Sequence, residues 1–359
     1  MALVSLRYLR ISVTSRCNLA CLFCRPGCGH GVAAAEPGED VLSREEIVCF
    51  VRLAVACGIE KVRVTGGEPL VRPDIIEVIR DLASLPSLRD LSLTTNGTLL
   101  PRLARPLREA GLRRINIGLS AMDPEVYRRI TRVGRAEDGP SGLRAAVDTG
   151  FDPIKVNVVV LRGINDREIP VLAGLTRELP IEVRFIEFMP FGRSAEELDR
   201  YLVPADAVLA RLRELGDLEP VPGTRGAGPG GTHRATVGLP DREPAPTVRG
   251  SGRSTDTAGQ ASRGTPRFAE RFRIRGYKGT IGLIAHHSEP FCHSCNRVRL
   301  TADGKLRACL IEGGEQDALP LIRQGLDRPT MERLLATAAA MKPALHAGSF
   351  RGQMHRIGG

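Results

Sequence analysis

The stretch RYLRISVTSRCNLACLFC, residues 7–24, combines the two patterns that decide the fold. Its first half is rich in bulky and β-branched residues and predicts a strand. Its second half places Cys17, Cys21 and Cys24 in a CxxxCxxC run directly after that strand. A four-iron cluster normally takes four thiolates and a structural zinc ion takes four ligands, so this run supplies one ligand too few.

Composition restricts what the chain can be. It has 359 residues, of which 42% are hydrophobic, and a net charge of +10. This length accommodates one large α/β core and a smaller additional region. No stretch reaches the roughly 18 apolar residues of a membrane span, and the N-terminus lacks the apolar region of a signal peptide. We therefore expect a cytoplasmic protein with no membrane partner. The positive charge suits a nucleotide phosphate, whereas the absence of Trp and of a basic aromatic stripe argues against nucleic acid.

Short β-rich runs recur along the first 220 residues, beginning near positions 7, 61, 91, 115, 154 and 183. The gaps between them carry helix signals: Ser43 and Glu46 form a capping box, Gly58 closes that helix, and Pro73 begins the next. Repeated β-then-α units predict parallel strands with right-handed crossovers. The fold class is therefore α/β, an incomplete TIM-like (β/α)6 barrel over residues 1–220, with its chemistry at the carboxyl ends of the strands.

The remaining residues divide into two regions. Residues 221–267 are rich in Gly, Pro, Ser, Thr and Arg with little to bury, which predicts a flexible insertion. In residues 268–359 the run FRIRGYKGTIGLIA predicts paired strands, and a second cysteine group follows, with Cys292 and Cys295 in a CxxC motif and Cys309 beyond it.

Nine cysteines in a reducing compartment indicate metal binding or catalysis rather than disulfides. For the first group, Cys28 or His30 could close a zinc site, or Cys28 could complete a saturated electron-transfer cluster. Alternatively, one iron is left open to bind a substrate or cofactor. Outside both groups, Cys49 and Cys57 follow the apolar pattern of the first helix and are predicted to lie in the core.

The CxxxCxxC run after a first strand, with GGEP at the end of the second, resembles the radical S-adenosylmethionine (SAM) superfamily. This resemblance implies that SAM chelates the open iron of a [4Fe–4S] cluster held by Cys17, Cys21 and Cys24. It also implies that the backbone around Gly66 and Gly67 accepts the SAM amino group, a close approach that glycine permits.

The same stretch, the second cysteine group and the C-terminal IGG resemble the GTP 3',8-cyclase family. Its members form (8S)-3',8-cyclo-7,8-dihydroguanosine 5'-triphosphate in the first step of molybdenum cofactor biosynthesis. The resemblance covers about residues 7–220 and resumes at about 268. It implies a second [4Fe–4S] cluster on Cys292, Cys295 and Cys309, whose open iron faces the guanine of GTP.

The resemblance also implies a GTP-binding cavity. For Arg10, Arg63, Lys155 and Arg184, strand alternation supports this independently, because a buried charge needs a counter-ion and a triphosphate supplies one. The residues that match GTP-contacting positions are Arg10, Lys61, Arg63, Thr94, Lys155, Arg184, Arg297, Val298 and Arg299.

Several residues at the implied SAM site depart from the family pattern. Where members carry a serine that touches SAM, this chain has Gly118, and Ser120 is a candidate replacement. Phe23 stands where a tyrosine is frequent, and retains the ring without the hydroxyl. Met189 matches a position that packs on SAM, although a Met at a strand end is also ordinary core filler.

The chain ends in Gly358 and Gly359, which are read as a frayed end without the family. With it, they are expected to enter the barrel beside GTP and act with Cys17, Cys21 and Cys24 in catalysis. The implied partners are GTP, an unidentified electron donor and, as acceptor of the product, cyclic pyranopterin monophosphate synthase; a homodimer is also allowed. Rival classes are a two-cluster electron carrier, which has no use for GGEP, and a peptide-modifying radical SAM enzyme.

Overall fold

A computed structural model describes residues 5–24, 41–221, 270–346, 348, 350 and 354–357. Several predictions concern residues outside this set. They include those for Cys28, His30, Gly358 and Gly359, and those for nearly all of the insertion.

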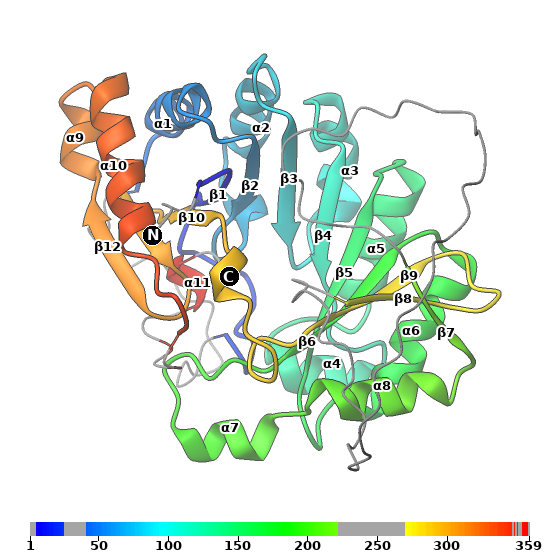
Figure 1. Cartoon of the computed structure of the whole chain (residues 1–359). Helices are drawn as coiled ribbons and strands as arrows, with labels where there is room; N and C mark the ends of the chain where they lie inside the picture. Colours follow the sequence, from blue (N-terminus) through cyan, green and yellow to red (C-terminus); the bar gives the residue numbers. More distant parts are fainter. Residues whose placement is uncertain are drawn as a thin grey trace, which may run out of the picture.

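One 12-stranded sheet organises the chain, in the order β12-β11-β10-β1-β2-β3-β4-β5-β6-β9-β8-β7 (Figure 1). The strands are β1 Tyr8–Ser12, β2 Lys61–Thr65, β3 Asp90–Thr95, β4 Arg114–Gly118, β5 Ile154–Val160, β6 Glu182–Glu187, β7 Leu218–Pro220, β8 Glu270–Ile274, β9 Thr280–Ile284, β10 Arg297–Leu300, β11 Lys305–Cys309 and β12 Gly313–Asp317. The starts of β1–β6 agree with the six predicted runs to within one residue.

Every neighbouring pair from β10 through β1–β6 to β9 is parallel, and the outer pairs are antiparallel. The predicted hairpin is confirmed as β8 and β9. Its place in the sheet was not predicted: β9 extends the barrel beside β6, while β10 extends it beside β1. Residues from the C-terminal region therefore lie at both edges of the six-strand barrel.

The helices are α1 Arg44–Ala56, α2 Ile75–Ala83, α3 Leu100–Glu109, α4 Pro124–Thr131, α5 Asp138–Asp148, α6 Ile169–Glu178, α7 Ala195–Tyr201, α8 Ala205–Arg213, α9 Leu319–Arg323, α10 Arg328–Ala340 and α11 Met354–Ile357, with short 3-10 turns η1 Pro69–Val71, η2 Asp166–Glu168 and η3 Cys292–Ser294. The predicted capping box of α1 is present, with Ser43 and Glu46 bonding each other's backbone. Gly58 follows the end of α1 with φ +103°, a conformation that suits glycine. Pro73 stands just before the N-cap of α2.

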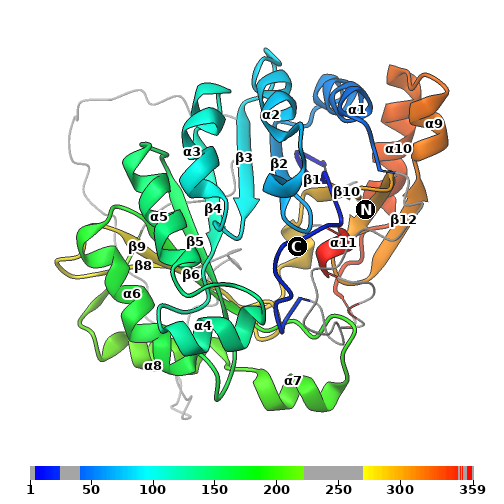
Figure 2. The same ribbon diagram turned by 180° about the vertical axis from the view of Figure 1, so that it is seen from behind.

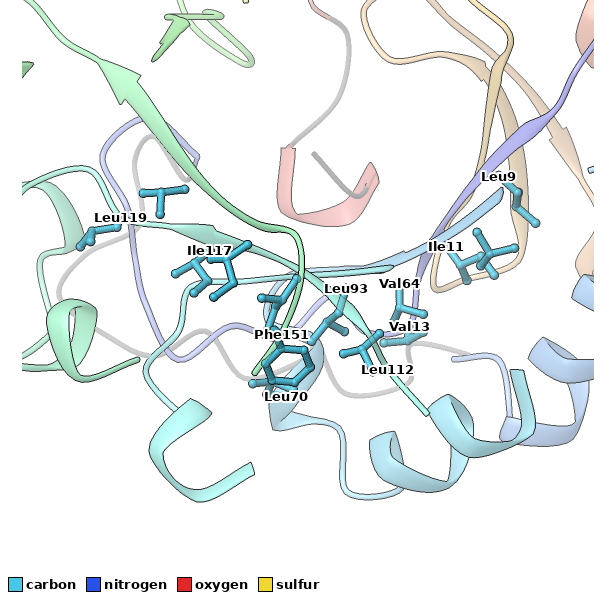
Figure 3. Close-up of a cluster of buried hydrophobic side chains, with 14 of the residues drawn as sticks. Leu9, Ile11, Val13, Val64, Leu70, Leu93, Leu112, Ile117, Leu119 and Phe151 are labelled. Carbon is cyan, nitrogen blue, oxygen red and sulfur yellow. The ribbon is translucent and has the colours of Figure 1, made fainter. Parts of the chain in front are cut away.

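The main core lies between the outer face of the sheet and the helices α1, α2, α3, α5 and α6, which follow one another along that face (Figures 1 and 2). Alternate strand residues such as Leu9, Ile11, Val64, Leu93 and Ile117 point into it and are fully buried (Figure 3). Because side chains alternate along a strand, their neighbours face the concave side of the sheet.

Two cysteine predictions need correction. Cys49 and Cys57 are half-buried rather than core residues. Only Cys57 packs against the core edge, where α1 meets α10 and its Sγ lies 4.0 Å from the carbonyl oxygen of Arg328. Within the described ranges, no helix has the length and apolar character needed to cross a membrane.

Candidate active site

The first cysteine group lies in the loop after the carboxyl end of β1. Cys17, Cys21 and Cys24 are half-buried and form no disulfide. Burial raises the pKa of Cys21 well above its usual value, and the neighbouring Cys24 and Cys17 add to this. The three sulfur atoms therefore lie near one another, as a shared inorganic group requires, and binding it would stabilise their thiolate forms.

This loop is held from two sides. The backbone N–H groups of Ala20 and Leu22 donate to the carbonyls of Thr131 and Ile130 at the end of α4, over 3.1 and 2.8 Å. From the segment after β6, the buried guanidinium of Arg193 donates to the carbonyl of Leu22. Sequence reasoning missed Arg193, because its partner is a backbone atom far away in the chain.

The two glycines of GGEP lie against the cysteine loop. A Cβ on Gly66 would come within 2.5 Å of the carbonyl oxygen of Thr14, and one on Gly67 within 2.1 Å of that of Arg16. The N–H of Gly67 donates to the Thr14 carbonyl over 2.8 Å. Glycine is thus required here by the close approach of two backbones, a reason independent of the predicted SAM contact.

Glu68, the acid of GGEP, joins the ends of β2 and β3. Its buried carboxylate accepts hydrogen bonds from the Thr95 hydroxyl, the Asn96 N–H and the Leu70 N–H, over 2.7, 2.7 and 3.0 Å. Burial raises the pKa of Glu68 to about 7. The sequence analysis used only the glycines of this motif, yet an acid directly after them at a strand end was a usable signal.

The second cysteine group lines an open pocket. Cys292 begins η3, Cys295 follows it, and Cys309 ends β11. The Lys342 ammonium donates to the Sγ of Cys295 over 3.5 Å. Burial alone would raise the pKa of Cys295, but the charges of Arg297 and Lys342 outweigh it and lower the pKa. One thiol of this group is therefore poised to ionise and act as a ligand.

The two cysteine groups lie at opposite ends of the pair β1 and β10. The first follows the carboxyl end of β1. The second precedes the amino end of the parallel β10, where the Asn296 carbonyl accepts from the N–H of Arg7 and of Tyr8. Since β1 runs from Tyr8 to Ser12, its length separates the groups by roughly 13 Å along the strand.

The donor sets fit iron–sulfur clusters better than single ions. Over the described ranges, no three His, Cys, Asp or Glu side chains are placed to hold one metal ion. Each cysteine group nevertheless brings three thiols close enough to shift one another's pKa. Three neighbouring thiols can hold a [4Fe–4S] cluster and leave its fourth iron open.

The concave face between the groups is cationic. By register, Arg10 of β1 is flanked by Arg63 of β2 and Arg299 of β10, and Tyr8 by Lys61 and Arg297. Five of the predicted cations are thus brought together on three adjacent strands.

Val298, by contrast, pairs with Leu9 in the core and is fully buried. Its side chain does not share the face of the cations, so a role in binding GTP could involve only its backbone.

Tyr8 stands among the arginines. The guanidinium carbons of Arg10 and Arg63 lie 5.8 and 5.5 Å from the centre of its ring. Burial alone would raise the pKa of Tyr8, but Arg63, Arg10 and Arg297 outweigh it and lower the pKa to about 8. Burial also lowers the pKa of Arg63, to about 9, with a contribution from neighbouring guanidinium groups. Such a cluster is electrostatically prepared for an anion.

Lys155 and Arg184, which were also expected to bind the triphosphate, already have a carboxylate partner. Both pair with the buried carboxylate of Glu182, Lys155 through Nζ at 3.2 Å and Arg184 through Nε at 2.5 Å, and Arg271 approaches it at 3.5 Å. The need for a triphosphate as their counter-ion is therefore weaker at these two residues, because Glu182, two residues before Arg184, already supplies a carboxylate. Burial, together with Arg184, still lowers the pKa of Lys155 to about 8.

Several strand side chains of the barrel have buried polar atoms with no hydrogen-bond partner among the described residues. They include the Nε of Arg10 and the side-chain oxygens of Thr94, Asn116 and Asn157. Buried polar atoms are nearly always hydrogen-bonded, so these atoms indicate a polar ligand in the barrel. Thr94 was predicted; the two asparagines, on β4 and β5, were not.

The predicted SAM residues occupy the neighbouring strand ends. A Cβ on Gly118 would have only one neighbour, the Thr95 carbonyl at 3.8 Å, so this position has space for the serine that the family carries. Ser120 is buried, and its carbonyl accepts from the amide of Asn165 over 2.8 Å. Phe23 is partly buried against the main core.

A small second apolar cluster connects the SAM side of the site to the second cysteine group. Its buried members are Phe191, Ile311, Phe350 and Ile357, with Met189 and Cys309 packed against them. The rings of Phe191 and Phe350 meet edge to face at 5.3 Å. Because Ile357 belongs to α11, the cluster anchors the last described turn on the side of the sheet opposite to the helices (Figure 3).

Two family models match the chain: the Radical SAM superfamily over residues 11–175 and Molybdenum Cofactor Synthesis C over residues 251–348. A GTP 3',8-cyclase of Moorella thermoacetica is 40% identical over 341 residues, covering 95% of this chain and 92% of the relative. The chain belongs to the GTP 3',8-cyclase family. A second family member, from Pelotomaculum thermopropionicum, is 38% identical over 359 residues and covers 99% of this chain and 98% of the relative.

The predicted family and fold class are thereby confirmed. This GTP 3',8-cyclase family chain has a radical SAM partial barrel of parallel strands and a C-terminal extension. Among solved structures, SuiB of Streptococcus suis bound to S-adenosylmethionine is 18% identical and covers 59% of this chain and 47% of its own, with a TM-score of 0.43. That likeness is too weak to support a functional conclusion.

Proposed function

We propose that this protein is a radical SAM GTP 3',8-cyclase that catalyses the first step of molybdenum cofactor biosynthesis. The observation that supports this best is the arrangement of two three-thiol groups at opposite ends of β1, with a cationic face between them. A closed electron carrier has no use for such a face, whereas a nucleotide triphosphate held between two reactive centres does.

Cys17, Cys21 and Cys24 would hold a [4Fe–4S] cluster whose open iron binds SAM. The cluster and SAM would supply a 5'-deoxyadenosyl radical, which would take the C3' hydrogen of GTP and become 5'-deoxyadenosine. C3' would then bond to C8, and one electron from the electron donor together with one proton would complete the product. The protein positions the reactants: carbonyl groups at Gly66 and Gly67 would face the SAM amino group. The candidates for the rest of the SAM site are Phe23, Gly118, Ser120 and Met189.

The second group, Cys292, Cys295 and Cys309, would hold another [4Fe–4S] cluster against the guanine. The triphosphate would lie on Arg10, Lys61, Arg63, Arg297 and Arg299, whose mutual repulsion it relieves. Thr94 and the backbone of Val298 add polar contacts. Because Glu182 already neutralises part of their charge, we assign Lys155 and Arg184 a weaker share of this binding.

The remaining proposals concern the domain layout, the cellular compartment and the partners. We propose the layout 1–220 barrel, 221–267 insertion and 268–359 second-cluster region. Half-buried cysteines that form no disulfide suit the reducing cytoplasm. The proposed partners are GTP, an electron donor, cyclic pyranopterin monophosphate synthase as acceptor of the product, and a second copy in a homodimer.

The decisive experiment is anaerobic incubation of the reconstituted protein with SAM, dithionite and GTP, followed by mass analysis. We expect the cyclised nucleotide and 5'-deoxyadenosine. Formation of 5'-deoxyadenosine with GTP unchanged would keep the radical SAM assignment and reject GTP as the substrate.

Iron content tests the two-cluster arrangement separately. Wild-type protein reconstituted without oxygen should contain about eight irons. Cys309→Ser should lose roughly half of them while still binding SAM, because the first group is untouched. Cys49→Ser is the matched control, since Cys49 is a half-buried cysteine outside both groups. A wild-type protein that never exceeds about four irons contradicts the proposal.

A further inference from the structure

His286 forms part of the wall of the pocket that holds the second cysteine group. It lies just after β9, in the loop that leads to η3. Its ring is tilted by 50° against the ring of Phe291, with the ring centres 4.6 Å apart. Its Nδ1 atom is buried and has no hydrogen-bond partner among the described residues. A buried polar atom left without a partner beside a ligand pocket indicates a group that the ligand satisfies.

The surroundings of His286 fix its chemical form. Burial lowers the pKa of His286 to about 3, and the charges of Arg297, His346, Arg299 and Arg10 act in the same direction. The ring is therefore neutral and presents one donor and one acceptor nitrogen. A neutral ring adds no positive charge to attract a phosphate, but its two nitrogens can pair with the donor and acceptor atoms of an uncharged polar group.

The backbone around His286 is held in place. Both oxygens of the buried Glu187, at the end of β6, are used: Oε2 accepts from the N–H of His287 and of Ser288 over 2.8 and 3.0 Å, and Oε1 accepts from the N–H of Ala205 over 3.0 Å. On the other side, Nε2 of His346 lies 3.4 Å from the His286 carbonyl oxygen. These contacts hold the backbone that carries His286.

Phe291 extends the same wall, and the guanidinium of Arg297 lies 5.2 Å from the centre of its ring. A flat aromatic surface beside a neutral donor and acceptor matches a purine base, which offers a π face and polar edges. We propose that His286 is a specificity-determining residue whose Nδ1 hydrogen-bonds the guanine of GTP at the second cysteine group. This inference rests on the proposed function.

Three variants test it in anaerobic, reconstituted protein. His286→Phe keeps a ring of similar shape without the nitrogen, and we expect GTP to bind roughly ten- to hundred-fold more weakly, the loss typical of a buried hydrogen bond. His286→Asn places a polar group near the Nδ1 position and should restore most of the affinity. His287→Ala is the matched control, because the adjacent His287 side chain is exposed and only its backbone is bonded.

Equilibrium dialysis would compare two probes, GTP and inorganic tripolyphosphate, with iron content measured alongside. We expect His286→Phe to weaken GTP alone and to retain its iron. Unchanged GTP affinity, or an equal loss for both probes, would overturn the role in base recognition. If His286→Phe fails to fold, His286→Asn provides the test. A His286→Asn protein that loses as much affinity for tripolyphosphate as for GTP would also overturn the role in base recognition. Wild-type protein that binds tripolyphosphate but gains nothing from the guanosine would instead reject the proposed function.

Discussion

Tyr8 places an ionisable hydroxyl among the guanidinium groups proposed to bind the triphosphate. Its pKa of about 8 lies close to physiological pH. Below this pH the Tyr8 hydroxyl is neutral, so the positive charge of Arg10, Arg63 and Arg297 is available to bind the ligand. Above it a phenolate forms, neutralises part of that charge and repels phosphate. Sequence reasoning passed over Tyr8, because the effect depends on three arginines from three strands.

We therefore expect the affinity for GTP to fall by roughly tenfold between pH 7 and pH 9, because protonation of Tyr8 favours the complex. Tyr8→Phe, which cannot form a phenolate, should show a clearly smaller fall. Equilibrium dialysis at pH 7, 8 and 9 measures both. Lys155, with a pKa also lowered to about 8, should cause the dependence that remains in the variant. Identical pH profiles for the two proteins would exclude Tyr8 and leave the effect to Lys155 and to Arg63, whose pKa is lowered to about 9.

Gly67 tests whether the two backbones must touch. A Cβ at this position would lie 2.1 Å from the Arg16 carbonyl oxygen, so Gly67→Ala should push the GGEP turn away from the cysteine loop. We expect a loss of about 1–3 kcal/mol in the free energy of unfolding and weaker SAM binding. Gly174→Ala is the control: it lies within α6 with no atom within 4 Å of a new Cβ, and should stabilise the protein by up to ~1 kcal/mol. Thermal unfolding measures both variants. An unchanged stability of Gly67→Ala would show that the turn relaxes without a clash.

At the scale of elements, the hairpin of β7 and β8 brackets the insertion. The two strands pair in antiparallel register, with Pro220 opposite Phe272. The residues on either side of the insertion are thus neighbours in the sheet, and a short turn can join them. Replacing residues 221–267 with a short Gly/Ser linker should leave cyclase activity within a few-fold and both clusters in place. If activity is lost while the iron remains, the insertion serves the reaction.

The local pattern of the sequence was enough to locate β1–β6, the capping box of α1 and both cysteine groups. These features depend on residues close together in the chain. The pairing of β10 with β1 was not predictable in the same way, because its choice of edge depends on how the whole sheet closes. The same limit explains Glu182, Glu187 and Arg193: each has partners in distant segments, and only the fold reveals them. The prediction that Cys49 lies in the core was wrong, because an apolar pattern along a helix does not show where the buried face ends.

For the molecule as a whole, the last described helix, α11, packs beside the second cysteine group. Ile357 packs against Phe191, Ile311 and Phe350, in the cluster that also holds Met189 and Cys309. Deleting Gly358 and Gly359 should leave iron content and GTP affinity nearly unchanged, since other residues make those contacts. We expect formation of the cyclised product to fall by at least ~100-fold, because small displacements of reacting groups have large effects on rate. The matched variant Gly358→Ala/Gly359→Ala separates chain length from the need for small residues, and near-normal turnover by the truncated protein would make the tail a loose end.

The order of strands in the sheet has a consequence for how the protein is made. Tyr8 pairs with Arg297, so β1 leaves the ribosome long before β10 exists. At about 5–20 residues per second, β1 waits roughly 15–60 s for β10, and β6 waits roughly 5–20 s for β9, each with one edge unpaired. Unpaired strand edges are sites of association with other chains. Cells that produce this protein must therefore shield two edges of every nascent barrel, and chains that terminate before β9 should aggregate rather than accumulate as a folded half.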